Sequence, residues 1–409
     1  MNSRIRLGLV TVSVALVSYI VVGGVLSRGD TASDTKTSDQ TYRDLGVYQE
    51  VLSRVSSQYV TEPDLHKVTE GAIRGMLEAL DPFSTYFTPQ EFKEYMAHPN
   101  PGPASVGLYI SKRYGYAPVV SVLPGSPADK AGIKAADLID RIGDTSTREL
   151  SVVQINRMLA GDPGSTVILW VVREARGEPQ KVVLNRETLD HVPVVAKMLP
   201  DDTAYIRVAR FDSGAADEVG NKLKSLTAQG AKNLVLDLRN CAGGEVDEAV
   251  KTASLFIDHG LIAYTAGQRS PRQDINANPQ IPAAPVSNLP LAVLINRSTA
   301  GAPEIVADAV LNDKRGDVVG GQSFGVGVVE KVVPVGDGSG LLLAVAKYYG
   351  PDGKAIQDNG VKPNVPFPPP DEVGIAEEIT PEQFGTQDDS QLQKAIDVLK
   401  QKVAPAKAA

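Results

Sequence analysis

The chain has 409 residues, which predicts two or three domains, and its 42% hydrophobic and 22% charged residues exclude a wholly disordered chain or a coiled-coil rod. A net charge of −8 without basic runs argues against nucleic acid as the main partner. One cysteine excludes an internal disulfide, and four histidines without a Cys/His cluster argue against a structural zinc site. We therefore expect neither a metal nor a cofactor.

The N-terminus has the pattern of a membrane anchor, expected over residues 1–28. Arg4 and Arg6 precede an uncharged stretch, Leu7–Leu26, which is long enough to cross about 30 Å of hydrocarbon as a helix. A cleaved signal peptide is the alternative, although the end of the stretch offers only a weak cleavage site. Because flanking arginines stay on the cytoplasmic side, we expect the rest of the chain in the periplasmic part of the cell envelope.

Two helices are expected after the anchor. Residues 29–40 are polar and aperiodic and are expected as a linker, followed by a helical region over residues 41–103. In the first helix, Val47, Val51, Val55 and Tyr59 recur on one face until Pro63 ends it. The second helix is expected from Asp64 to Leu80, with the apolar residues of one face turned inward: Val68, Ile73, Met76, Leu77 and Leu80.

Residues 104–190 change to short β-like runs separated by turns, an α+β pattern. The expected strands are Val106–Ser111, Pro118–Leu123, Asp137–Ile142, Thr166–Arg173 and Gln180–Asn185, and the expected helices are Pro127–Ala131 and Val152–Leu159.

Residues 195–365 alternate strand and helix, which predicts an α/β layer architecture. The expected strands are Ala204–Val208, Asn233–Leu238 and Leu291–Ile295, and the expected helices are Gly214–Ala228, Val246–Phe256 and Pro303–Leu311. Residues 267–289 are expected as a surface loop, and the Pro-rich residues 366–388 as a linker. The last part, residues 389–409, is expected to hold an amphipathic helix, Ser390–Val403, with Leu392, Ile396, Leu399 and Val403 inward.

Five segments, in order, resemble motifs of the C-terminal processing (tail-specific) serine peptidases. They are Leu80–Pro89 before the PDZ domain, Gly125–Ile133 in the PDZ core, Leu236–Gly244 (family L-D-L-R-N-N-P-G-G), Ala346–Gly353 and Gly360–Val365. The resemblance implies an α/β protease-type core with an inserted PDZ-like α+β domain, an N-terminal helical segment and an N-terminal membrane helix. The core corresponds to residues 195–365 and the PDZ domain to residues 104–190.

The family's chemistry uses a serine nucleophile and a neutral lysine base, and this chain lacks both. The family motif S-A-S-A-S-E-I corresponds to Ser298–Ile305, which places Gly301 at the nucleophile. The motif T-F-G-K-G corresponds to Ser323–Gly327, which places Val326 at the base. Glycine has no nucleophile and valine no base, so the resemblance indicates an inert member. The amides of Gly243, Gly244 and Ala302 correspond to oxyanion donors.

Substitute catalytic groups are the alternative. Ser298 and Thr299 lie just upstream of Gly301, and Cys241 lies in the Gly-rich turn, where a thiolate of lowered pKa can be nucleophilic. Lys331 and Lys347 are the candidate bases. For each of these residues, capping, packing or solvation is the simpler interpretation. The same holds for a carboxylate pair of Asp237 and Glu304, which more simply hold turns and helix ends.

The PDZ-like module keeps the parts that bind peptides. The segment Val106, Gly107, Leu108, Tyr109 and Ile110 resembles the carboxylate-binding loop and its strand. We therefore expect an adaptor or scaffold that binds C-terminal or unfolded peptide ends, with an active protease paralogue as a further partner and the terminal helices as a surface for a homodimer. An active serine-type endopeptidase with a substitute nucleophile and a purely structural envelope protein remain the alternatives.

Overall fold

The computed structural model describes residues 31–99, 102–112, 115–173, 177–281, 289–368 and 383–403. The chain divides into two units, Met1–Ile73 and Arg74–Ala409, and the second unit contains both the PDZ-like module and the α/β core. The expected membrane anchor lies outside the described residues. Within the described ranges, no helix is long and apolar enough to span a membrane.

The first unit is helical. Helix α2 is Thr31–Gln58, and helix α3, Leu65–Glu78, continues into the second unit. The expectation of a tether up to residue 40 is wrong from Thr31 onward, because this polar run contains neither Gly nor Pro and extends the helix that follows it. The inward face expected for α3 is also mostly wrong, since Leu77 is buried whereas Val68, Met76 and Leu80 are exposed.

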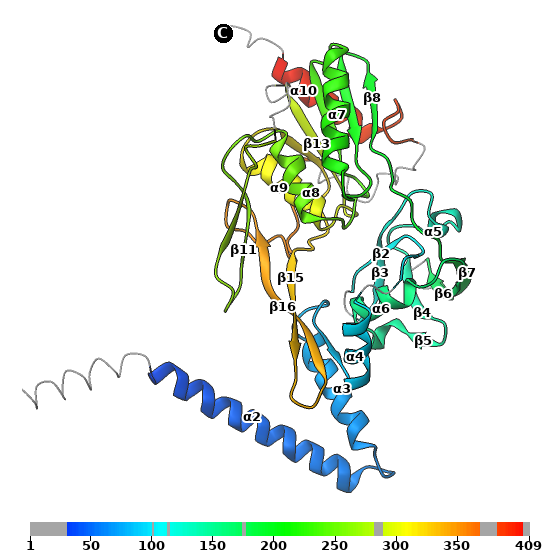
Figure 1. The fold of residues 1–409 in the computed structure, drawn as a ribbon, viewed down its shortest axis with the longest axis vertical. Coiled ribbons are helices and arrows are strands. Elements are labelled where there is room, and N and C mark those ends of the chain that lie inside the picture. Colours follow the sequence, from blue (N-terminus) through cyan, green and yellow to red (C-terminus); the bar gives the residue numbers. More distant parts are fainter. Residues whose placement is uncertain are drawn as a thin grey trace, which may run out of the picture. The chain divides into compact units, whose positions relative to one another are not determined.

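The second unit begins with a short segment that joins an antiparallel sheet. Strand β1 (Thr85–Phe87) pairs with β16 (Gly340–Tyr349), and Thr88 then caps helix α4 (Pro89–Ala97) through a capping box with Glu91. The sheet has the order β1-β16-β11-β12, with β15 also paired to β16. Its other strands are β11 (Leu261–Ala266), β12 (Gln273–Asn276) and β15 (Val328–Pro334). Strands β11, β15 and β16 of this sheet are labelled in Figure 1.

The PDZ-like module follows the predicted pattern closely. Its sheet has the order β2-β3-β4-β6-β7, with β5 paired to β4. The strands are β2 (Leu108–Ile110), β3 (Ala117–Val122), β4 (Leu138–Ile142), β5 (Thr145–Ser146), β6 (Thr166–Val172) and β7 (Gln180–Asn185); the helices are α5 (Pro127–Lys130) and α6 (Val152–Leu159). A separate apolar core fills the module, so it is an α+β domain with its own interior.

The α/β core is built on a six-stranded sheet of order β17-β14-β13-β10-β9-β8. Its strands are β8 (Val195–Leu199), β9 (Thr203–Arg207), β10 (Asn233–Asp237), β13 (Leu291–Ile295), β14 (Asp317–Gly320) and β17 (Val365–Pro366). The neighbours from β9 to β17 are parallel, and only β8 is antiparallel. Parallel strands need helices on both faces, which explains why β10 and β13 read as unbroken apolar runs.

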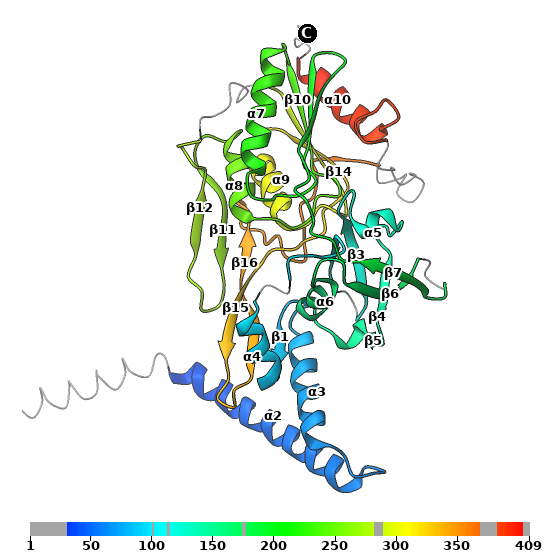
Figure 2. The same cartoon turned by 45° about the vertical axis from the view of Figure 1, so that its right-hand side comes forward.

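Helices cover both faces of this sheet (Figure 2). Helices α7 (Ala215–Ala228), α8 (Val246–Ser254) and α9 (Ala302–Asn312) pack on the face that carries Leu234 and Leu236. Helix α10 (Ser390–Val403) packs on the face that carries Val235. The alternation along β10 therefore assigns successive side chains to two different cores.

Two expected loops contain structure. Within residues 267–289, strand β12 pairs with β11, because a hairpin satisfies backbone groups that a loop would leave to water. The linker expected over residues 366–388 is also partly wrong, since β17 ends at Pro366 and Phe384 is buried against the core.

Candidate functional site

The Gly-rich turn at the end of β10 is held against the loop before α9. The amide of Gly243 donates to the carbonyl of Ala300 at 2.9 Å, and the amide of Ala300 donates to the carbonyl of Cys241 at 3.0 Å. Gly244 has φ +91°, and a Cβ there would lie 2.5 Å from the carbonyl oxygen of Phe211, so only glycine fits. The Gly-rich turn and the loop before α9 correspond to loops that carry catalytic groups in the family that this chain resembles, and here they lie side by side.

Gly301 stands at the start of α9 in an unusual backbone conformation, φ 78° and ψ −124°. Its amide donates to Oε2 of Glu304 at 2.7 Å. A Cβ built on Gly301 would have its nearest neighbours 3.7 Å away, at Gly243 and at the hydroxyl oxygen of Tyr109. The position keeps room for a side chain, in a conformation that strains any residue other than glycine.

Glu304 ties the loop of Val326 to the start of α9. Its fully buried carboxylate accepts hydrogen bonds from the Ser323 hydroxyl at 2.5 Å and from the amides of Gly325 and Val326, each at 2.8 Å. Burial raises the pKa of Glu304 from 4.5 to about 7, although these donors oppose the shift. The residue is a structural clamp, as the simpler interpretation of Glu304 predicts.

Val326, which the family motif assigns to the lysine position, lies in apolar surroundings. Its side chain packs with Phe324 and Tyr109 around the buried residues Val120, Ala242 and Ala300. Val326 has no proton-accepting group, and its neighbours in this cluster are apolar side chains and the ring of Tyr109. The pair of positions 301 and 326 therefore offers neither nucleophile nor base.

Tyr109 of the PDZ-like module reaches this place, which the sequence did not predict. Ile110 of β2 and Val106 just before the strand belong to the module's own core, whereas Tyr109 of β2 lies against the Gly-rich turn. Burial, with the Glu304 carboxylate adding to it, raises the pKa of the Tyr109 hydroxyl above its ordinary value, so it stays protonated. A second contact joins the module to the Gly-rich turn, because the hydroxyl of Ser121 on β3 donates to the carbonyl of Asn240 at 2.6 Å.

The substitute nucleophiles are poorly placed for catalysis. Cys241 is fully buried, and burial raises the pKa of its thiol, which is the opposite of activation. The Thr299 hydroxyl donates to the carbonyl of Leu238 at 2.8 Å, and the Ser298 amide donates to Asn296. The candidate bases Lys331 and Lys347 are exposed. The acceptors of the two hydrogen bonds above are Leu238 and Asn296, and neither acceptor is a lysine.

Asp237 does not pair with Glu304. It accepts from the Arg239 Nε at 2.9 Å and from the Tyr205 hydroxyl at 2.7 Å, all three residues being buried. The Arg239 guanidinium also holds Asp389. Among the residues the structure describes, no group of His, Cys, Asp or Glu is arranged to hold a metal ion.

A cleft of about 360 Å³ opens beside the Gly-rich turn. Its walls come from the PDZ-like loop around Gly107 and Leu108, from Tyr109, from the turn Ala242–Gly244 and from the loop at Arg210. The structure thus brings the predicted peptide-binding segment and the predicted oxyanion glycines to one cleft. Whether these glycines serve as donors stays a prediction, because the Gly243 amide is bound to Ala300.

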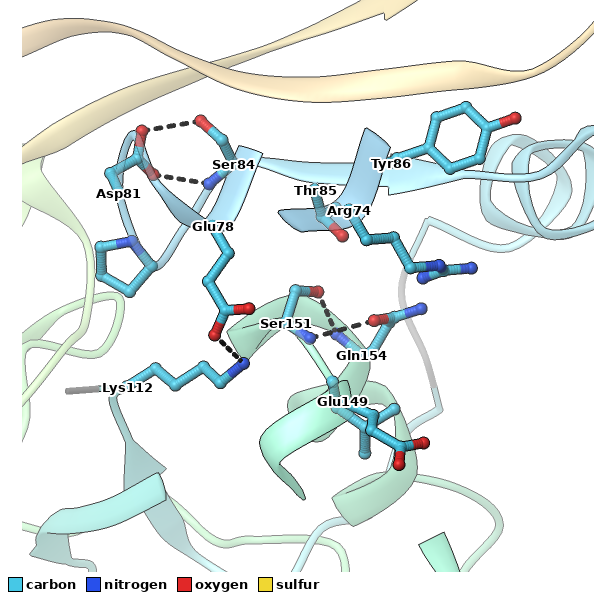
Figure 3. A pocket seen from close by; sticks show the side chains of 12 residues that line it. Arg74, Glu78, Asp81, Ser84, Thr85, Tyr86, Lys112, Glu149, Ser151 and Gln154 are labelled. Carbon is cyan, nitrogen blue, oxygen red and sulfur yellow. Dashed lines mark hydrogen bonds and ion pairs between the residues drawn. The ribbon is translucent and has the colours of Figure 1, made fainter. Parts of the chain in front are cut away.

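A second, smaller cavity of about 40 Å³ lies where α3, β1 and the PDZ-like module meet (Figure 3). Lys112 lies at its wall, and its buried Nζ donates to Glu78 Oε1 at 2.8 Å and to the carbonyl of Arg148 at 2.9 Å. Across the cavity, Asp81 accepts from the Ser84 hydroxyl at 2.8 Å. Since its volume is close to that of a water or two and Lys112 is already bound to Glu78, we interpret this cavity as a structural contact region between these elements.

Comparison with known proteins identifies three domains in the chain. Peptidase family S41 matches residues 202–367, a PDZ domain matches residues 119–173, and the N-terminal domain of the activating protease CtpB matches residues 20–90.

Similar proteins share most of the chain. A carboxyl-terminal-processing protease of Picosynechococcus is 33% identical over 82% of this chain and 80% of its own. A carboxy-terminal-processing protease of Bartonella bacilliformis is 30% identical over 81% of this chain and 76% of its own. The solved structure of the photosystem II D1 C-terminal processing protease superposes with a TM-score of 0.64 at 29% identity, covering 78% of this chain and 92% of that one.

Proposed function

The chain belongs to the family of carboxyl-terminal processing proteases of peptidase family S41, and from this premise we propose that it is a member without peptidase activity that binds peptide C-termini. The observation that carries the proposal is the pair Gly301 and Val326 at the dyad positions. The two loops keep their hydrogen bonds to each other and to Glu304, so the site has the family's frame without its reacting groups.

The alternative is an endopeptidase with a substitute nucleophile. It requires a serine or cysteine with an adjacent base. Cys241 is buried with a raised pKa, and position 326, where the family motif has its lysine, holds a valine in an apolar cluster. The geometry therefore favours binding over cleavage.

Peptide hydrolysis by the purified full-length chain tests the proposal. Unfolded proteins with apolar C-termini serve as substrates, and a relative with serine and lysine at the two positions serves as the positive control. We expect no cleavage by this chain. Turnover that disappears in Cys241→Ala or Ser298→Ala would show a substitute nucleophile and overturn the proposal.

We further propose an adaptor role at the cell envelope, with residues 7–26 as the anchor and the bulk of the chain on the periplasmic side. The support is the uncharged stretch behind Arg4 and Arg6. Full-length chain should stay in the membrane pellet after alkaline carbonate extraction, and chain lacking residues 1–30 should not. Addition of the chain to an active paralogue should change the rate at which that enzyme processes unfolded substrate; an unchanged rate argues against the adaptor role.

A further inference from the structure

The cleft beside the Gly-rich turn has a nearly uncharged wall with a single cation. Small or apolar residues and two serines form nearly all of its wall, and Arg210 is the only charged residue among the described residues that line it. Its volume, about 360 Å³, is in the range of ligand-binding pockets. A pocket with one cation in an otherwise uncharged wall favours an anionic group on a ligand that is otherwise neutral.

Arg210 is held in place for such a role. It lies between β9 and α7, next to Phe211, which is fully buried and anchors the loop. Its Nε contacts Oδ1 of Asp212 at 2.6 Å, and Asp212 also faces His191 at 3.8 Å. Since Asp212 engages Nε, the guanidinium is oriented, and its side chain keeps 38% of its surface exposed. The two terminal nitrogens of an arginine are the donors that bind a carboxylate in bidentate fashion.

The walls fit a peptide backbone. Gly107, Gly243 and Gly244 leave main chain at the surface of the cleft, and β2 is an edge strand of its sheet. An extended peptide can pair with main-chain groups of this kind without much side-chain preference. No residue of α6, a helix that the structure describes in full, lines the cleft.

Tyr109 lies between the cleft and Gly301. This side chain lines the cleft, and its hydroxyl oxygen lies 3.7 Å from the position of a Cβ on Gly301, which itself does not line it. A peptide that enters from the PDZ-like loop therefore meets the ring of Tyr109 before it reaches the former catalytic position. This arrangement suits the end of a chain better than a chain that passes through.

We propose that this cleft receives the C-terminal residue of a bound peptide, with Arg210 as the counter-ion of the terminal carboxylate. The inference rests on the proposed function, because it says where the peptide end binds. It places the carboxylate on the core domain, next to the inert catalytic loops, and not on the PDZ-like loop alone.

The first test compares free and amidated versions of one short peptide with an apolar C-terminus, by calorimetry on the full-length chain. In Arg210→Gln we expect the affinity for the free peptide to fall roughly tenfold to a hundredfold, as for loss of a charge-assisted hydrogen bond, with the affinity for the amidated peptide unchanged. Arg272→Gln is the matched control, because its Nε contacts Asp274 two residues away in the same way at 2.5 Å. The control should bind like the native chain.

A second variant covers the case in which Arg210→Gln does not fold. Leu189 lines the cleft, whereas Val183 is exposed on the β7 edge of the same module. A bulky maleimide on Leu189→Cys should abolish binding of the free peptide, and the same label on Val183→Cys should not. The native Cys241 does not interfere, because it is buried with a raised pKa.

The outcomes separate the two proposals. Binding that needs a free C-terminus but is unaffected by Arg210→Gln and by the label at 189 would overturn this inference and leave the proposed function intact. Absence of binding by any peptide of a varied panel would overturn both.

Discussion

Asp308 on α9 has a buried carboxylate oxygen, Oδ2, without a hydrogen-bond partner among the described residues. Burial, with repulsion from Asp352, raises the pKa of Asp308 from 3.8 to about 7. The folded state therefore holds a proton that the unfolded state has released. Protonated Asp308 therefore contributes to the free energy of unfolding at low pH, and this contribution is lost as the pH rises through about 7.

Replacing Asp308 with asparagine should remove the loss of stability that accompanies ionisation of the carboxyl group. At about pH 5 the native side chain is neutral, like asparagine, whereas at about pH 8 it is a buried charge. We expect the variant to gain about 1–3 kcal/mol of unfolding free energy over the native chain between these two pH values. Urea unfolding at both pH values measures it, with the exposed Asp313→Asn as the control. Parallel pH profiles for Asp308→Asn and the native chain would contradict the prediction.

The backbone at Gly301 makes a second prediction at the scale of one residue. Because φ 78° and ψ −124° strain any residue with a Cβ, Gly301→Ser should cost about 1–3 kcal/mol, even though no atom lies within 3.4 Å of that Cβ. Gly321→Ser is the control, since a Cβ there meets nothing within 4 Å and its φ is not positive. Equal unfolding free energies for the two variants would show that the strain is absent.

The same variant tests the chemistry. A serine at position 301 has no base while Val326 is present, so an active-site serine probe should leave Gly301→Ser and Val326→Lys unlabelled. Nucleophile and base work as a unit, so only the double variant is expected to react. Labelling of either single variant would show that another group activates the serine.

At the scale of elements, the C-terminal helix is fixed to the core by buried charges. Arg239 donates to both oxygens of Asp389, at 2.8 and 2.6 Å, just before α10 begins. The ring of Phe384 lies over the guanidinium groups of Arg207 and Arg239, at 4.0 and 4.7 Å from its centroid. Leu392, with other apolar residues of α10, then covers one face of the parallel sheet. The helix is thus part of the core and not an appended tail.

Breaking this contact should loosen the C-terminal segment. Asp389→Ala leaves part of the Arg239 charge buried without its partner, which costs about 3–5 kcal/mol. Urea unfolding and the rate of proteolysis within residues 383–403 measure the effect. Asp397→Ala, an exposed acid on the same helix, is the control and should change little. The prediction fails if both variants unfold like the native chain.

Local patterns predicted the elements well and their long-range partners poorly. Val152–Leu159 and Ser390–Val403 form helices with the predicted bounds, because each has an apolar stripe at helical spacing. The pairing of β12 with β11 was missed, since it depends on a partner strand more than on a pattern of its own.

The candidate site shows the same limit. The assignment of Gly301 and Val326 to the dyad positions rests on the family motifs alone, because each motif is contiguous in sequence. The approach of Tyr109 to Gly301 joins residues almost two hundred positions apart, and no local spacing encodes it. One signal was present in the sequence: along β2, Tyr109 alternates with Leu108 and Ile110, so it had to point away from the module's own core.

At the scale of the second unit, two apolar cores meet at a few side chains. The PDZ-like module and the α/β core each have their own cluster of buried residues. They are joined at the site by a small apolar cluster in which Tyr109 and Val120 of the module pack against residues of the core, and by the hydrogen bond from Ser121 to Asn240. Because the join is small compared with either core, Tyr109 should contribute a large part of the coupling between the two domains.

Removing the ring of Tyr109 should therefore uncouple the unfolding of the PDZ-like module from that of the α/β core. Tyr109→Ala takes a buried aromatic group from the join and leaves the interior of each domain unchanged, so we expect the module at residues 104–190 to unfold before the core. Hydrogen exchange should show faster opening of β2 and β3 with native protection in β10 and β13. Tyr116→Ala is the control, because Tyr116 is an exposed tyrosine of the same module that stacks on Arg148. A single cooperative transition in Tyr109→Ala, with protection lost equally in both domains, would mean that the two cores are coupled through contacts other than this ring.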